Sequence, residues 1–167
     1  YVSTDGNNVL HEDTDRVYKG SGLPEYELGL NIQATYKNWF FATNWFASIG
    51  NEVYNATRAN ALRVGRHRDL LFQYIPGVNE NTDIPAYRTP NRGDLNFNGS
   101  SDFFVEDGSF LRLRNVVVSY SLPKDVTEKL GFSRFNIYAN AQNVLTITNY
   151  SGLDPEVGGN NISIKGI

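Results

Sequence analysis

The feature that most constrains this chain is a strict alternation of side-chain character between Tyr26 and Tyr36. Every second residue is apolar, and the residues between them are Glu, Gly, Asn, Gln and Thr. The apolar positions are Tyr26, Leu28, Leu30, Ile32, Ala34 and Tyr36. Because successive side chains of an extended strand point to opposite faces, this pattern predicts a strand with one apolar and one polar face.

A second run of the same kind spans residues 39–49, after only Lys37 and Asn38. One face of this run would carry Trp39, Phe41, Trp45, Ala47 and Ile49. Two long strands separated by about two residues are typical of a β-hairpin. We therefore expect residues 26–36 and 39–49 to pair in one sheet.

Two further strands are predicted, over residues 110–122 and 134–148. The apolar positions of the first change from odd to even numbers midway, which predicts a β-bulge near Arg114–Asn115. Between the two strands, Pro123 opens and Gly131 closes a short helical connection.

Residues 50–108 lack such alternation and are rich in Gly, Asn, Asp and Arg. We expect one long, partly structured loop there, with a short helix near residues 55–62. A loop of this length inside a compact domain is uncommon and is usually functional. Residues 149–167 are expected to form a second loop.

Composition narrows the class of protein. Aromatic residues make up 13% of the chain, while the mean hydropathy is −0.41. This combination favours β-structure with one wet and one apolar face over disorder. The net charge of −3 argues against a nucleic-acid partner. There is no cysteine, no apolar run of transmembrane-helix length and no signal peptide, and the polar start suggests that the protein begins upstream.

Strand length and loop placement favour a membrane barrel. Membrane strands need about 9–11 residues, whereas soluble strands usually have about 5–6. The short connections would all fall on one side of the sheet and the long loops on the other, as in outer-membrane barrels. Tyr36, Trp39 and Tyr120 would mark the membrane interface on the short-turn side and Tyr26 the other interface. A secreted antiparallel sandwich, with its polar face in solvent, is the alternative.

The C-terminal half of the chain contains the motif VEDGSFLRLRN at residues 105–115, continued by YSLP at 120–123, QNVL at 142–145 and YSGLDPE at 150–156. In combination these motifs resemble the C-terminal barrel of SusC/RagA-type TonB-dependent transporters. Weaker matches are the Asp15-Arg16 to Pro24 segment, Tyr36-Lys37-Asn38, GNEVYN at 50–55 and NENTDIP at 79–85. Two positions depart from the family pattern: Phe110 stands where Tyr is usual, and Tyr74 stands where Trp is usual.

The resemblance implies an all-β antiparallel up-and-down meander, part of a transmembrane barrel of about 22 strands. It implies nutrient uptake across the bacterial outer membrane, of oligosaccharides or other large nutrients such as peptides. The implied partners are a SusD-like surface lipoprotein, outer-membrane lipid, and the energy-coupling protein TonB, which would bind an N-terminal part of the family's chains. A plug domain upstream and one more strand downstream are also implied, so the 167 residues would be a partial barrel domain.

The candidate contact residues are aromatic and Arg side chains, the usual anchors of recognition surfaces. In the long loop they are Arg63, Phe72, Tyr74, Tyr87 and Arg88. On the third strand they are Arg112 and Arg114, which would either line the lumen or pair with carboxylates there.

No catalytic constellation or cofactor motif is present, so an enzyme is not expected. Glu106 and Asp107 are adjacent on a strand and would point to opposite faces, which argues against a paired acid–base site. His67 lies in a basic cluster with Arg63, Arg66 and Arg68. This cluster would be either a solvated patch of the loop or a contact surface for an acidic partner or ligand. The stretch from Asp5 to Asp15 is rich in oxygen ligands but lacks the spacing of a calcium loop, so no metal site is predicted.

Overall fold

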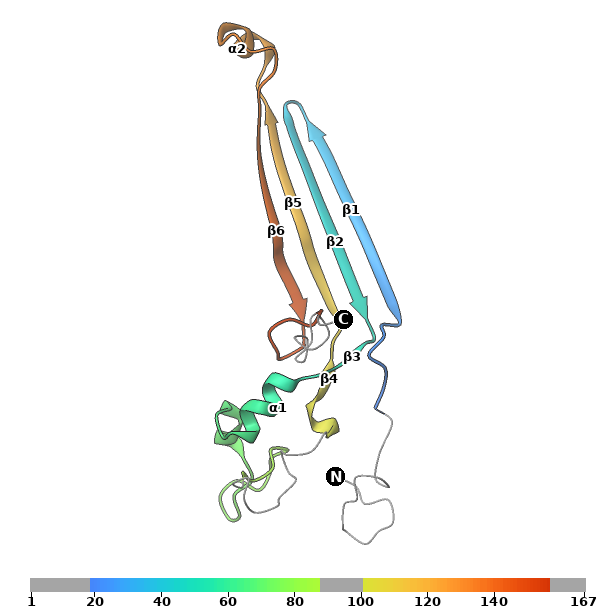
Figure 1. Cartoon of the computed structure of the whole chain (residues 1–167), viewed down its shortest axis with the longest axis vertical. Helices are drawn as coiled ribbons and strands as arrows, with labels where there is room; N and C mark the ends of the chain where they lie inside the picture. Colours follow the sequence, from blue (N-terminus) through green and yellow to red (C-terminus); the bar gives the residue numbers. More distant parts are fainter. Residues whose placement is uncertain (1–18, 88–100, 157–167) are drawn as a thin grey trace, which may run out of the picture.

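A computed structural model describes residues 19–87 and 101–156, and its main body is a single four-stranded antiparallel sheet (Figure 1). The strands are β1 (Tyr26–Tyr36), β2 (Trp39–Ile49), β5 (Phe110–Ser121) and β6 (Asn136–Thr148). They are hydrogen-bonded in the order β1-β2-β5-β6, each antiparallel to the next. The predicted meander is therefore confirmed.

The β1–β2 hairpin closes at Lys37–Asn38, as predicted. Tyr36 pairs with Trp39 and Tyr26 with Ile49, so all 11 residues of each strand are in register. Lys37 adopts a φ of 52°, which is the left-handed conformation that two-residue hairpin turns require.

The predicted bulge lies in the middle of β5. Asn44 of β2 pairs with Asn115 and Trp45 pairs with Leu113, so Arg114 is the extra residue. The β5–β6 register shifts at the same level, near Asn143, which has a φ of 51°. The bulge restores a common face to the apolar residues on both sides of it.

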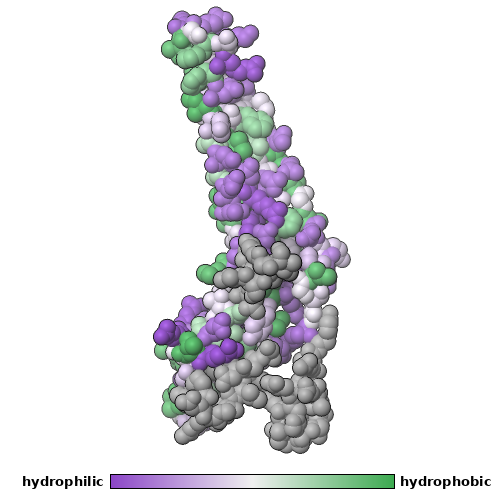
Figure 2. All heavy atoms as spheres, in the orientation of Figure 1, coloured by the Kyte–Doolittle hydropathy of each residue, from purple (hydrophilic) through white to green (hydrophobic). Residues whose placement is uncertain are grey.

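The sheet is a single layer with two chemically different faces. The register places the apolar residues of all four strands on one face, where Leu28, Leu30, Ile32, Phe41 and Ile137 are exposed. The only other sheet in the described residues has two short strands, and the apolar face has no sheet packed on it. The sandwich alternative is therefore wrong. Figure 2 shows hydrophilic residues along the middle of the sheet in that view.

Both short connections lie at one end of the sheet (Figure 1). One is the β1–β2 turn, and the other contains α2 (Lys124–Lys129). Gly131, with a φ of 75°, ends this turn, and the Phe132 N–H donates to the Thr127 carbonyl. β6 starts two residues later than predicted, although the Leu122 N–H still bonds the Phe135 carbonyl at 2.9 Å.

The segment between β2 and β5 is a folded unit, which we call the loop unit (residues 50–87 and 101–109). The prediction of a partly structured loop with a short helix near residues 55–62 is confirmed, and four further short elements accompany that helix in the described residues. Its elements are β3 (Glu52–Tyr54), α1 (Ala56–Arg63), η1 (Arg68–Phe72), η3 (Asp102–Phe104) and β4 (Val105–Asp107). β3 pairs with β4 and so continues the β2–β5 pairing past the end of the sheet. A small core of Ala59, Leu62 and Phe104 holds the unit together. Among the described residues, no helix is long and apolar enough to cross a bilayer.

Candidate functional site

The loop unit is organised by Asn55, a buried polar residue between β3 and α1. Its Oδ1 accepts a 2.9 Å hydrogen bond from the Arg58 N–H and so caps the helix N-terminus. Its backbone N–H donates to the Phe104 carbonyl at 2.7 Å. One residue thus fixes both the start of α1 and the approach of η3 to it.

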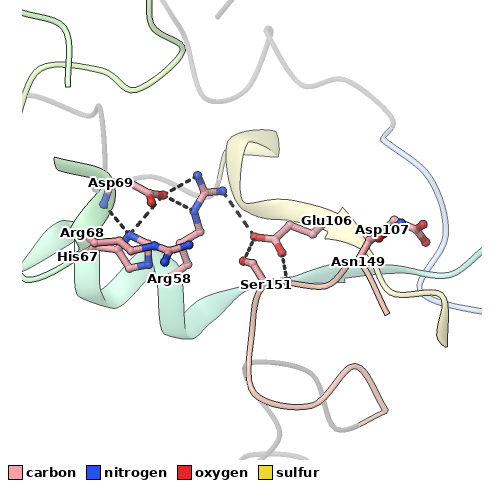
Figure 3. A pocket seen from close by; sticks show the side chains of 8 residues that line it. All are labelled: Arg58, His67, Arg68, Asp69, Glu106, Asp107, Asn149 and Ser151. Atoms are coloured by element: carbon pink, nitrogen blue, oxygen red, sulfur yellow. Dashed lines mark hydrogen bonds and ion pairs between the residues drawn. The ribbon is translucent and has the colours of Figure 1, made fainter. Parts of the chain in front are cut away.

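Glu106 on β4 joins the loop unit to the segment that follows β6 (Figure 3). Its carboxylate accepts from the Ser151 N–H and hydroxyl, both at 2.8 Å, and from Asn55 Nδ2 at 3.1 Å. The Arg58 guanidinium lies 3.5 Å away on the other side. Asp107 points away from this cluster, as strand geometry predicts. Glu106 is therefore a structural tether rather than half of a carboxylate pair.

Arg58 links α1 to η1. Its Nε and Nη2 lie 3.0 and 2.9 Å from Asp69 Oδ2, and its guanidinium stacks over the Phe103 ring at 4.7 Å. His67 Nδ1 accepts from the Asp69 N–H at 3.2 Å and lies equally close to Asp69 Oδ2. His67 Nδ1 therefore caps the N-terminus of η1 as an acceptor, and Arg58 is the charged partner of Asp69.

Tyr150 is buried beside this network. Burial, and secondly the negative charge of Glu106, raise the pKa of its phenol above the usual value. Glu106 and Ser151 also border an open cleft of about 700 Å³. The cleft is lined by Arg58, His67, Arg68, Asp69, Glu106, Asp107, Asn149 and Ser151. Its three acidic residues offset its basic ones, so it is not an anion site of strong charge.

A second ionic cluster lies on the polar face of the sheet. Arg112, almost completely buried, donates to Asp154 Oδ1 and to Glu156 Oε2, both at 2.6 Å, and to Thr146 at 3.0 Å. Arg114 donates to Glu156 Oε1 at 2.7 Å and lies over the Phe46 ring at 3.7 Å. Residues 154–156 therefore fold back over the polar face of the sheet.

The predicted contact residues do not form one site. Phe72 and Tyr74 are exposed. Tyr87 packs against the core of the unit, and Arg63 ends α1 with a 3.4 Å bond to Asn60. Arg112 and Arg114 belong to the ionic cluster on the sheet. Arg88, like His11 and the Asp5–Asp15 stretch, lies outside the described residues.

Phe72 and Tyr74 lie in a short stretch of chain with three further exposed apolar residues that the sequence analysis did not single out, and we call these five residues the tip patch. Its other members are Leu71, Ile75 and Val78, and Leu71 and Val78 are about 80% exposed. Asn79 and Thr82, from the NENTDIP motif, hold the chain beneath it by bonding the Phe72 carbonyl at 2.9 and 2.7 Å. The available signal was five large apolar residues within eight positions of a loop, without strand or helix periodicity.

No group of three or more His, Cys, Asp or Glu side chains within residues 19–87 and 101–156 could hold a metal ion. The buried charges are paired with one another, and Glu106 and Arg112 act as tethers between segments.

No protein-family model matches the chain. Similar curated proteins are the TonB-dependent receptor P3 of Formosa agariphila, 31% identical over 158 residues, and the TonB-dependent receptor SusC of Bacteroides thetaiotaomicron, 32% identical over 160 residues. These matches cover 93% and 94% of this chain but 15% of each relative. The chain thus spans about one seventh of the length of these relatives.

Solved structures of the RagAB peptide importer share the fold. The open-open state gives a TM-score of 0.73 at 26% identity, over 91% of this chain and 17% of that one. The closed-closed state gives 0.72 at 26% identity, over 96% and 18%. The relatives are receptors and importers, and proteins of this type are β-barrels of the outer membrane. The chain is a barrel segment of the SusC/RagA-type TonB-dependent transporters.

Proposed function

We propose that these 167 residues are the C-terminal part of the barrel of an outer-membrane nutrient importer. The whole protein would take up oligosaccharides or other large nutrients such as peptides, with energy supplied through TonB. The observation that carries the proposal is the single-layer sheet, whose exposed apolar face is backed by a polar one. Relatives named TonB-dependent receptor, SusC and RagAB peptide importer support it.

The dimensions of the apolar face fit a bilayer. The 11 residues of β1 span about 34 Å at the usual rise per residue. At a tilt of about 45° this becomes about 24 Å along the membrane normal, and the apolar band of such barrels is about 25 Å tall. The polar face, with Asn31, Asn44, Asn115 and Gln142 at one level across the sheet, would face the lumen.

The two ends of the sheet suggest its orientation. Outer-membrane barrels have short periplasmic turns and long extracellular loops. We infer that the β1–β2 turn and α2 lie on the periplasmic side, and that the loop unit and residues 149–156 lie outside the cell. TonB would act through parts of the protein that precede this chain.

The tip patch is the surface that we propose for docking of a SusD-like surface lipoprotein. Its residues are exposed and apolar. They belong to the loop unit, which the hydrogen bonds of Glu106 hold to the segment after β6. Arg63 and Tyr87 would contribute through the shape and charge of the same unit. Arg114, whose side chain is 39% exposed, would meet a ligand or the plug in the lumen, while Arg112 positions residues 154–156.

The test uses the full-length transporter in intact cells. Deleting residues 79–85, or making the double substitution L71S/V78S, should impair lipoprotein co-purification and uptake while the barrel still assembles. R66S, at an exposed position of the same unit, is the matched control. Normal docking and uptake in both loop variants would overturn the role of the patch. Protease cleavage of the loop unit from the periplasmic side only would overturn the orientation.

A further inference from the structure

The β5–β6 connection presents apolar side chains at the end of the sheet opposite the loop unit (Figure 1). Val126, Leu130, Phe132 and Phe135 are all exposed, and Leu130 is 58% exposed. Exposed apolar side chains do not stabilise a helix of six residues in water. Their surroundings on the sheet indicate what covers them.

These residues continue the lipid-facing side of the barrel. Phe135 has the same strand parity as Ile137, which is on the apolar face, and it extends the ladder through its bond to Leu122. The Phe132 ring lies 5.7 Å from the Phe135 ring. The apolar surface of Phe132 and Phe135 is therefore continuous with the outer face of the sheet.

The depth of these residues follows from the strand geometry. Trp39 and Tyr120 pair across β2 and β5 with ring centroids 4.7 Å apart, at the level expected for an aromatic belt. Phe135 is two residues beyond Ile137, the β6 partner of Tyr120. Two residues correspond to about 7 Å along a strand, or about 5 Å along the normal at a 45° tilt. The headgroup layer beyond the hydrocarbon core is about 5–7 Å thick on each side, so Phe135 falls within it.

The helix α2 is amphipathic. Val126 and Leu130 are four residues apart and share one side, while Glu128 lies about 200° from each. The segment contains three cations, Lys124, Lys129 and Arg134, and two carboxylates, Asp125 and Glu128, so its net charge is +1. Apolar side chains flanked by Lys and Arg are the composition of segments that lie in the membrane interface.

We propose that residues 122–135 form an interfacial anchor whose apolar side chains insert among phospholipids of the leaflet on the short-turn side. The occupant is phospholipid, because Phe132 and Phe135 continue the lipid-facing side of the sheet and Phe135 falls at headgroup depth. The inference depends on the membrane location of the barrel and not on which nutrient it carries.

The experiment places a fluorophore on each side of α2 in the full-length transporter. L130C and the matched control E128C, in a background without other reactive cysteines, are labelled with an environment-sensitive dye. The proteins are reconstituted in phosphatidylethanolamine–phosphatidylglycerol vesicles, with or without a nitroxide on the upper acyl chain. Heat-modifiable gel mobility confirms that each barrel is folded.

We expect the dye at position 130 to emit at shorter wavelength and to be quenched at least two-fold more by the nitroxide lipid than the dye at 128. Equal quenching at the two positions would overturn the anchor. So would shielding of position 130 from both nitroxide lipid and aqueous iodide, because that result would place a protein surface there. Uptake loss from L71S/V78S is independent of this readout, so failure of the anchor is distinguishable from failure of the proposed function.

Discussion

The guanidinium of Arg112 donates to Asp154, 42 residues later in the chain, across 2.6 Å. Arg112 is on the polar face of β5, and Asp154 belongs to the segment after β6. Together with the bond from Arg112 to Glu156, this pair holds the YSGLDPE segment against the inside of the sheet rather than letting it extend from the strand end. The strand and the loop are thus one structural unit.

Replacing Arg112 with Gln should release this segment. The variant loses two charge-assisted bonds, and since Asp154 and Glu156 are more than a third exposed, water screens part of the cost. We expect a local destabilisation of about 1–3 kcal/mol. Hydrogen exchange of residues 150–156 in the full-length transporter should accelerate accordingly. R114Q, which loses one exposed pair, is the control with a smaller effect, and unchanged exchange in R112Q would refute the tether.

Tyr150 should make the same segment sensitive to alkaline pH. Its phenol pKa is raised by burial and then by Glu106, so the unfolded phenol ionises near pH 10 while the folded one stays neutral. The stabilisation is fully present below pH 10 and is lost as the pH rises toward the raised value. Proteolysis of residues 149–156 should therefore increase above pH 10 in the native chain, with a smaller increase in Y150F.

At pH 7, the Y150F substitution should change the local stability of this segment very little, because the buried hydroxyl of Tyr150 has no hydrogen-bond partner among the described residues. A large loss of protection in Y150F at pH 7 would show that the hydroxyl has a bonding role, contrary to this account.

Gly108 permits the close approach of β4 and β3. A Cβ there would lie 2.4 Å from both Asn51 Nδ2 and Val53 Cγ2 and 3.1 Å from the Asn51 carbonyl oxygen. G108A should displace the loop unit at a cost of about 1–3 kcal/mol. The readout is protease sensitivity of the loop unit on intact cells. G29A is the matched control, since a Cβ at Gly29 meets nothing within 4 Å; equal protease resistance of the two variants would contradict the packing.

Much of the sheet could be predicted because its determinants are local. Period-2 alternation fixes the faces of β1 and β2, a two-residue turn fixes their register, and the change of parity in β5 places the bulge at Arg114. The loop unit depends on contacts that no local pattern encodes. Asn55 and Glu106 are 51 residues apart, and Asn55 and Ser151 are 96 apart. The tip patch has no periodicity, so its exposure becomes visible only when Asn79 and Thr82 are seen bonding the Phe72 carbonyl.

An Arg substitution should lower the yield of folded barrel at Ile32 of β1 but not at the adjacent Gln33. Ile32 is near the middle of the apolar face, where an Arg costs about 2–4 kcal/mol in a membrane barrel. I32R should therefore lower the amount of folded barrel in isolated outer membranes. Gln33 is on the polar face, and Q33R should leave the amount near normal. Equal yields would contradict the assignment of faces.

The central claim is that the apolar face of this sheet meets lipid and the polar face meets the lumen. A nitroxide scan of single-cysteine variants at positions 28–35, in the full-length transporter in lipid nanodiscs, tests it most directly. We expect that accessibility to oxygen alternates with a period of two residues and is highest at Leu28, Leu30, Ile32 and Ala34. Maxima at the odd positions, or accessibility without alternation, would contradict it.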